Sequence, residues 1–210
     1  MSGPDPAADP TGWFEPLYAA AERGETVVPW HRGEPNPHLV EWTRERDLDG
    51  RGRRALVVGS GLGDDAEHVA ALGFATVAFD ISPTAVRGAK RRFPGSPVDY
   101  VVADLLAAPR EWEQAFHFVV ENITVQALPA SVRPRAIAAI SGMVAPGGTL
   151  LVISGARGDA EDVEGPPWPL TRAEVESFAT GGVEAVRIED LPRPFGPWSH
   201  SWRAEFRRPA

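Results

Sequence analysis

The stretch Val57–Asp65, which reads VVGSGLGDD, decides the predicted fold. The apolar run Ala55–Gly59 leads into it and suits a strand buried on both faces. Glycines at 59, 61 and 63 then allow a tight turn into a helix and a close approach of a ligand to the backbone. A dinucleotide fingerprint spaces its glycines as G-x-G-x-x-G, but the sixth position here is Asp64, which would repel phosphate at a helix start. The loop predicts a ligand without pyrophosphate there, or a turn that only joins strand to helix.

Strands and helices alternate outward from this turn, which predicts an α/β fold with a parallel sheet. After the strand at 55–59, further strands are predicted at 75–80, 98–104, 116–122 and 147–155, and helices at 13–23, 36–48, 64–73, 82–93, 131–144 and 171–179. Asn36 and Ser82 are expected N-caps, and Thr171 with Glu174 forms a capping box. Two last strands, 183–191 and 199–208, follow without a helix between them. They predict an antiparallel edge with strands exposed on one face.

Composition narrows the class of protein. The chain has 210 residues, is 43% hydrophobic and carries a formal net charge of −8. The length predicts one domain, at 11–210, after a disordered tail at 1–10. The absence of cysteine excludes a disulfide scaffold and a cysteine nucleophile. The acidic balance argues against nucleic acid as a partner, and neither a secretory signal nor a membrane span is evident. We therefore expect a cytoplasmic monomer.

Two acidic residues follow predicted strands. Asp80 ends the second strand, 21 residues after Gly59, and Asp104 ends the third. A carboxylate at the first position can accept both ribose hydroxyls of an adenosine ligand, and one at the second can reach the adenine amino group. Helix capping or loop solvation are the alternatives. Together with the glycine loop, the two acids predict an adenosine crevice at the carboxyl edge of the sheet.

The segment 57–86, VVGSGLGDDAEHVAALGFATVAFDISPTAV, resembles the first two motifs of class I S-adenosylmethionine-dependent methyltransferases. With the upstream PWHRGEPNPHLVEW and the downstream GPPWPLTRAEV, it resembles the thiopurine S-methyltransferase and halide/thiol methyltransferase branch. The resemblance implies a Rossmann-like mixed sheet of seven strands in the order 3-2-1-4-5-7-6, with strand 7 antiparallel. It also implies a helical lid at 11–48, and S-adenosylmethionine as cofactor with S-adenosylhomocysteine as product.

The resemblance assigns cofactor contacts residue by residue. The methionine portion would lie by the glycine loop, the ribose on Asp80, and the adenine between the residues that follow the second and third strands. The end of the fourth strand would approach the methionine amino group or the substrate, and a lid tryptophan would close over the cofactor. The implied residues are Trp30, Gly59, Ser60, Gly61, Gly63, Asp80, Ile81, Asp104, Leu105, Val120 and Glu121.

The expected acceptor site departs from that branch at two positions. Asn122 stands where related enzymes often have tyrosine, and His31 where they often have aspartate. Both departures put halide in doubt as the acceptor. His31 is the first candidate for a general base, with a surface histidine of the lid as the alternative. Glu121 is a further candidate, although a role as cofactor ligand is the interpretation that we favour for it. Trp13, Trp168 and Trp198 would wall an apolar acceptor pocket with Trp30, and ordinary packing is the alternative. No His/Asp/Glu cluster has the spacing of a metal site.

The resemblance implies methyl transfer from S-adenosylmethionine to a small molecule, in the first place a thiol or another soft nucleophile. A thiolate would need only alignment with the methyl group. Methylation of oxygen or nitrogen on a small molecule is the alternative. A nicotinamide-dependent oxidoreductase and a catalytically silent adenosine-binding protein are two further readings from other classes.

Overall fold

The computed structural model describes residues 9–159, 163, 165–192 and 198–210. Apart from its last two residues, the predicted tail at 1–10 lies outside this described part. The chain divides into two compact units, Met1–Ala107 (unit 1) and Ala108–Ala210 (unit 2). None of the helices in the described ranges is long and apolar enough to cross a bilayer.

The strands form one seven-stranded sheet in the order β3-β2-β1-β4-β5-β7-β6, which confirms the predicted Rossmann-like α/β fold. Strand β7 runs antiparallel to both β5 and β6, whereas the pairs β1–β2, β2–β3 and β4–β5 are parallel. The strands are β1 (Arg54–Val58), β2 (Ala75–Asp80), β3 (Asp99–Val102), β4 (Phe116–Asn122), β5 (Val144–Gly155), β6 (Glu184–Pro192) and β7 (His200–Arg207).

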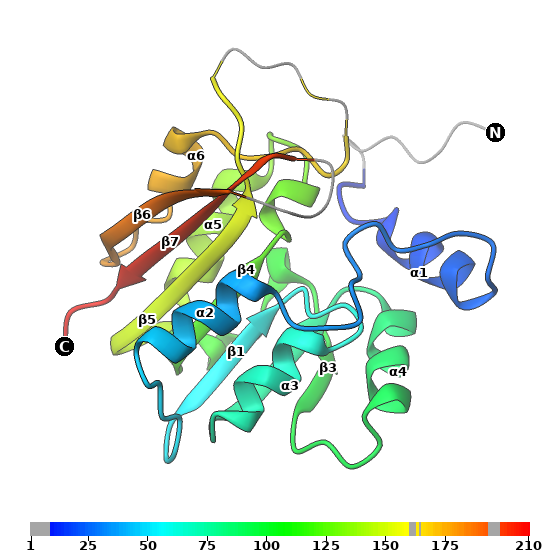
Figure 1. The fold of residues 1–210 in the computed structure, drawn as a ribbon, viewed down its shortest axis with the longest axis horizontal. Helices are drawn as coiled ribbons and strands as arrows, with labels where there is room; N and C mark the ends of the chain where they lie inside the picture. Colours follow the sequence, from blue (N-terminus) through cyan, green and yellow to red (C-terminus); the bar gives the residue numbers. More distant parts are fainter. Residues whose placement is uncertain (1–8, 160–162, 164, 193–197) are drawn as a thin grey trace. The chain divides into compact units, whose positions relative to one another are not determined.

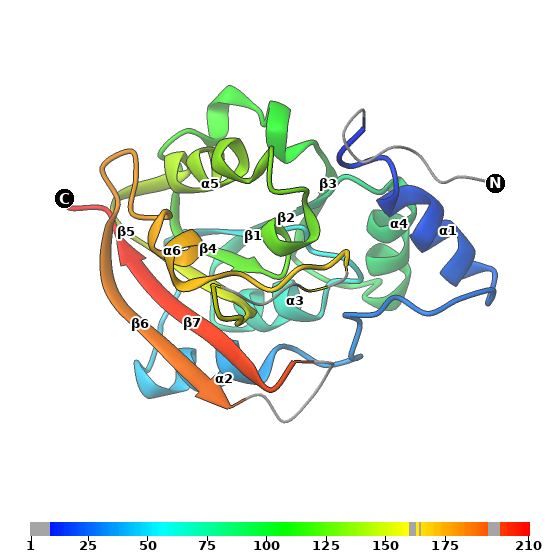
Figure 2. The same ribbon diagram turned by 90° about the horizontal axis from the view of Figure 1, so that it is seen from above.

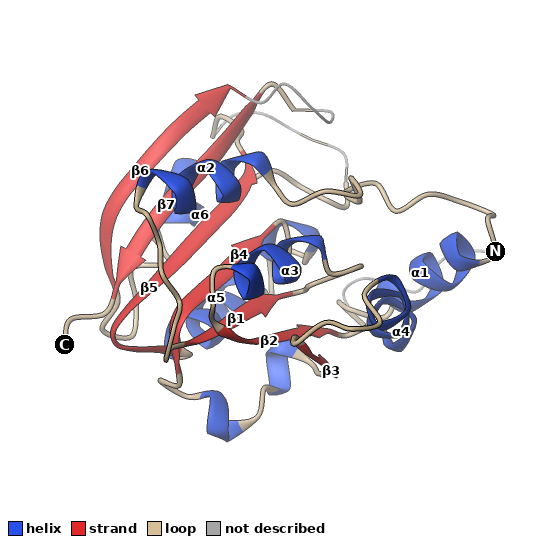
Figure 3. Cartoon of the chain, turned by 60° about the horizontal axis from the view of Figure 1, so that its bottom comes forward, coloured by secondary structure: helices blue, strands red, loops and turns tan. Residues whose placement is uncertain are grey.

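Unit 1 carries the first four helices, and α1 packs beside α4 (Figures 1 and 2). These helices are α1 (Phe14–Glu22), α2 (Pro37–Glu45), α3 (Asp64–Ala71) and α4 (Pro83–Arg92), followed by the 3-10 turn η1 (Leu105–Ala107). Both predicted N-caps are confirmed: the Asn36 side chain accepts from the His38 N–H, and Ser82 accepts from the Ala85 N–H. Figure 3 shows the strand–helix alternation along this unit.

Unit 2 has shorter helices than the sequence predicts. They are α5 (Arg133–Gly142) and α6 (Arg172–Glu176), with the 3-10 turns η2 (Arg110–Trp112) and η3 (Val125–Ala127). Helix α5 was expected to run to Val144, but it ends earlier because the Gly142 and Met143 carbonyls accept from Gln114 and Ala115 as β5 begins. The predicted capping box of Thr171 and Glu174 is confirmed at the start of α6.

The prediction that the last strand is exposed on one face is wrong. Ser201 to Ala204 are four consecutive buried residues of β7. The reason is the strand order: β7 pairs with β5 on one side and β6 on the other, and α6 packs against it. In β7 the alternation of polar and apolar residues therefore does not indicate which side chains are exposed. The outer strand β6 is the exposed one.

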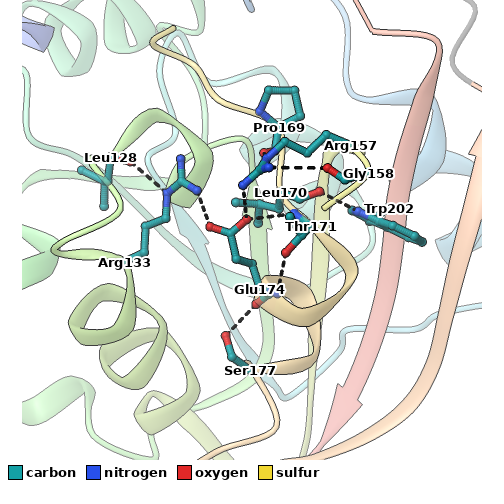
Figure 4. Close-up of polar contacts among 10 residues, drawn as sticks. All are labelled: Leu128, Arg133, Arg157, Gly158, Pro169, Leu170, Thr171, Glu174, Ser177 and Trp202. Atoms are coloured by element: carbon teal, nitrogen blue, oxygen red, sulfur yellow. Dashed lines mark hydrogen bonds and ion pairs between the residues drawn. The ribbon is translucent and has the colours of Figure 1, made fainter. Parts of the chain in front are cut away.

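An ion-pair network ties α5 to the start of α6 (Figure 4). Glu174 binds the guanidinium groups of Arg133 and Arg157, and Arg133 also donates to the Leu128 carbonyl at 3.0 Å. The Arg133 side chain is only 5% exposed. A buried guanidinium that loses its carboxylate is left uncompensated, which is strongly destabilising.

We therefore expect Glu174→Ala to lower the free energy of unfolding by about 3 kcal/mol. The exposed pair Arg172–Glu176, at 2.8 Å with both side chains at least half exposed, offers a matched control. Glu176→Ala should cost about 0.5 kcal/mol or less. Urea unfolding of the two variants measures the difference, and equal losses would contradict the structural role of the network.

Candidate functional site

The glycine turn after β1 adopts the geometry that the sequence predicts. Gly59, Gly61 and Gly63 all have positive φ, at 57°, 52° and 96°, a region that other residues enter only with strain. The Ser60 N–H donates to the Phe79 carbonyl at 2.8 Å, which fixes the turn against the end of β2. The Ser60 hydroxyl is buried and has no hydrogen-bond partner within the described residues.

Asp80, at the end of β2, joins this turn to the start of α4. One carboxylate oxygen accepts from the Gly61 N–H and the other from the Ser82 N–H, both at 2.9 Å. The residue is 5% exposed, and burial raises the pKa of its carboxyl to about 6 despite these donors. Each oxygen can accept a further hydrogen bond. The geometry therefore suits the two adjacent hydroxyls of a ribose.

Glu15, on α1, was missed by the sequence analysis. Its carboxylate accepts from the Ser82 hydroxyl and from the backbone N–H and hydroxyl of Thr84. These groups lie at the N-terminus of α4, where a negative charge is favourable. Their hydrogen bonds lower the pKa of Glu15 in spite of its partial burial. Glu15 thus fastens α1 to the same helix start that Asp80 holds.

Aromatic residues of the N-terminal segment pack together beside the glycine turn. Trp30 lies edge-on to Trp13, with ring centroids 5.8 Å apart, and contacts Phe14 and Tyr18 in the same way. Its indole N–H donates to the Tyr18 hydroxyl at 3.0 Å. Tyr18, a second residue the sequence analysis missed, places that hydroxyl 2.8 Å from where a Cβ on Gly61 would lie. The predicted residues Trp13 and Trp30 are therefore brought together.

The expected adenine contacts lie at the ends of β2 and β3. Ile81 follows Asp80 directly and is half-buried, and Leu105 is 7% exposed. The prediction that Asp104 ends β3 is wrong, because that strand stops at Val102. Its carboxylate accepts from the Leu106 N–H at 2.8 Å and so caps the short turn η1. Capping was the alternative reading of this residue.

His31 lies near the start of α3, where its ring contacts Asp64 and not Asp80. Its Nδ1 is 3.4 Å from an Asp64 oxygen, and the same carboxylate binds Arg92 through two hydrogen bonds. His31 also lines a cavity of about 540 Å³ formed by α1, the loop before His31, Leu62 and α4. The described residues that line this cavity do not include Asp80, the glycines of positions 59 to 63, or Trp30.

Unit 2 contributes Glu121, near the end of β4. The side chain is fully buried, and one oxygen accepts from the Val125 N–H at 2.9 Å. The other oxygen, Oε2, is buried without a hydrogen-bond partner within the described residues. Burial raises the pKa of Glu121 to about 7. A carboxyl of this kind can hold or release a proton near neutral pH.

The backbone after Glu121 is strained. Ile123 has φ 68°, which is an outlier for a β-branched residue, yet it is buried and its N–H pairs with Ile153 at 3.0 Å. The bend returns Val125 to the Glu121 carboxylate. Strain of this kind concentrates at functional sites. Val120 is fully buried within β4, whereas Asn122 is half-buried at its end.

Gln126, also missed from the sequence, lies between the segments that carry Trp168 and Trp198. Its side-chain oxygen accepts from the Gly155 N–H at 2.6 Å, and its backbone carbonyl from the Trp168 N–H at 2.7 Å. The Trp198 ring fills the space where a Cβ on Gly155 would lie. The buried Gln126 amide nitrogen has no partner within the described residues. A glutamine inside an otherwise apolar stretch was the available signal.

These features fit an adenosine ligand without a pyrophosphate better than a dinucleotide. In unit 1 the buried Asp80 suits a ribose, the unpartnered Ser60 hydroxyl lies in the turn, and both Asp64 oxygens bind Arg92 at the start of α3. In the described part of the chain, no three His, Cys, Asp or Glu side chains form a group that could hold a metal ion.

Residues 55–148 match the family model described as a methyltransferase domain. The chain is an S-adenosylmethionine-dependent methyltransferase. Across 189 residues it is 29% identical to the probable thiol methyltransferase 2 of Arabidopsis thaliana, covering 89% of this chain and 79% of that protein. The sequence similarity between this methyltransferase and that relative therefore extends over residues outside 55–148.

Two solved structures share the fold of this methyltransferase. The N-methyltransferase NodS of Bradyrhizobium japonicum, in complex with S-adenosylhomocysteine, superposes with a TM-score of 0.71 at 22% identity, covering 92% of this chain and 99% of that one. A structure from work on the conversion of a disulfide bond into a thioacetal group during echinomycin biosynthesis gives a TM-score of 0.75 at 23% identity, covering 95% and 91%.

If the ionised form of Asp80 holds the ribose, the affinity for S-adenosylhomocysteine should fall as the pH drops below about 6. With the pKa at about 6, about a tenth of the carboxyl is ionised at pH 5, so the dissociation constant should rise about tenfold between pH 7 and pH 5. Asp80→Asn should bind weakly at both values. Calorimetric titrations across this range test the dependence.

Asp99→Asn, which changes an exposed acid on β3, is the matched control and should keep the wild-type pH dependence. An Asp80→Asn variant that folds normally and binds as tightly as the wild type at pH 7 would contradict the assignment of the ribose to Asp80.

Proposed function

We propose that this methyltransferase transfers the methyl group to the sulfur of a small-molecule thiol, and that Glu121 takes the thiol proton. The observation that carries the proposal is the Glu121 carboxyl, fully buried, with one oxygen held by the Val125 N–H and the other unpartnered within the described residues. When bound, S-adenosylmethionine supplies an electrophilic methyl group on a sulfonium and leaves as the neutral thioether.

The acidity of Glu121 favours sulfur over oxygen as the acceptor atom. A thiol of the cysteine type has a pKa of about 8.5, close to the value of about 7 that burial gives the Glu121 carboxyl. Proton transfer to Glu121 Oε2 is then only slightly uphill and leaves a thiolate, a strong nucleophile. An alcohol is far less acidic, and this carboxylate would be a poor base for it. The similarity to a probable thiol methyltransferase supports the same acceptor.

We assign the other site residues in agreement with this chemistry. In unit 1, Asp80, Ile81, Asp104 and Leu105 would hold the adenosine, while Gly59, Ser60, Gly61 and Gly63 would receive the methionine portion, with Trp13 and Trp30 over them. In unit 2, Val120, Asn122, Gln126, Trp168 and Trp198 would surround the acceptor. Exclusion of water by such aromatic walls would raise the reactivity of the thiolate.

The base assignment passes from His31 to Glu121 for a structural reason. The His31 ring nitrogen lies 3.4 Å from Asp64, whose carboxylate is already engaged by Arg92. The side chain lines the 540 Å³ cavity, whose described lining includes Tyr18 and Leu62 but not Asp80. Glu121, in contrast, combines complete burial with an unpartnered oxygen next to a strained backbone. His31→Ala provides the comparison that separates the two candidates.

The decisive experiment uses thiols that differ in acidity. Glu121→Gln keeps the shape and the Val125 hydrogen bond but cannot take a proton. We expect its kcat with an alkanethiol at pH 7 to fall about 100-fold or more, the usual scale for loss of a general base. With an aromatic thiol that is already ionised, the loss should be much smaller. The release of S-adenosylhomocysteine measures both rates.

Glu113→Gln, an exposed change in the same unit, should keep wild-type rates with both thiols. The base role of Glu121 would be refuted by equal losses with both thiols, or by a dependence on thiol acidity that appears in His31→Ala instead. Turnover of phenols or amines but of no thiol by the wild-type protein would refute the sulfur acceptor.

A further inference from the structure

Tyr18 brings a hydroxyl to the glycine turn. The side chain is 4% exposed, and its oxygen lies 2.8 Å from the position of a Cβ on Gly61. Any residue other than glycine at 61 would therefore collide with this hydroxyl. The Gly61 N–H also donates to Asp80, the residue that we propose binds the ribose. Tyr18, Gly61 and Asp80 are therefore neighbours within unit 1.

The hydrogen bonds of this hydroxyl are only half used. A phenol has one proton to donate and lone pairs to accept. The Tyr18 oxygen accepts a hydrogen bond from the Trp30 indole N–H at 3.0 Å. Within the described residues, the structure gives the Tyr18 proton no acceptor, although the ring is buried. Burial and the nearby Asp80 charge both raise the pKa of Tyr18, so the proton stays in place at any working pH.

The position of Tyr18 is fixed from two sides. On α1, Tyr18 lies three positions after Glu15, whose carboxylate is anchored to Ser82 and Thr84 at the start of α4. Val28 and Ala85 pack with the Tyr18 ring in one apolar cluster. The hydroxyl is therefore held in a set direction, which is what a ligand-binding donor requires.

We propose that Tyr18 is a further cofactor-binding residue whose hydroxyl donates a hydrogen bond to the carboxylate of the methionine portion of S-adenosylmethionine. The inference rests on the proposed placement of that portion at Gly59–Gly61. A carboxylate is an acceptor-only group, and it matches a buried donor that has no other partner in the described structure. Trp30, in turn, acts on the cofactor partly by orienting the Tyr18 hydroxyl.

The test compares ligands with and without this carboxylate. Tyr18→Phe removes the hydroxyl and keeps the ring. Its affinity for S-adenosylhomocysteine should fall about tenfold, the scale of one charge-assisted hydrogen bond. Its affinity for decarboxylated S-adenosylhomocysteine and for 5′-methylthioadenosine should match that of the wild type. Titration calorimetry at pH 7.5 measures all three.

Tyr100→Phe is the matched control, because Tyr100 is the other tyrosine of the chain and donates to Glu67 at 2.7 Å. Its hydroxyl also lies 3.4 Å from the Gly63 carbonyl, so any change in affinity should be the same for all three ligands. Equal loss by Tyr18→Phe for the three ligands would overturn the proposal, since Tyr18 would then only support the packing of α1. Tighter binding of S-adenosylhomocysteine by Tyr18→Phe would overturn it too. These binding results do not depend on the acceptor, so they stand apart from the test of the thiol.

Discussion

The buried carboxylate of Asp80 is the constraint on which the candidate cofactor site of unit 1 depends. It joins the glycine turn after β1 to the start of α4 through two backbone hydrogen bonds of 2.9 Å. Because burial raises the pKa of this acid to about 6 in the folded chain, the ionised group opposes folding at neutral pH, and that penalty shrinks as the pH falls. A costly charge kept in such a place is best explained by a ligand that uses it.

Two buried acids of this methyltransferase have raised pKa values for the same physical reason and yet suit different tasks. Both oxygens of Asp80 are fixed by N–H donors, which hold its charge in place for a ligand. Glu121 has one fixed oxygen and one unpartnered within the described residues, and so suits proton transfer. The number of donors on each carboxylate, more than its burial, is the reason why we propose a binding role for Asp80 and a base role for Glu121.

The sequence predicted the parts of the structure that local rules govern. The three positive-φ glycines, Asp80, and the caps Asn36, Ser82 and Thr171 all follow from short-range patterns. Residues that act over long distances were missed. Glu15 bonds to Thr84, 69 positions away, and Tyr18 meets Gly61. An amphipathic helix indicates which face is buried, but its sequence does not name the partner. The burial of β7 was not predicted for the same reason. It depends on the order of the strands in the sheet and not on the alternation of polar and apolar residues.

The most direct test of the role of Asp80 is the proton balance of cofactor binding. S-adenosylhomocysteine should be titrated calorimetrically at pH 6 in buffers of different ionisation enthalpy. Two ribose hydroxyls donating to Asp80 would lower its pKa, so the wild-type protein should release about half a proton per ligand bound. Asp80→Asn should release none from this position. No proton release by the wild type, or equal release by both proteins, would contradict the account.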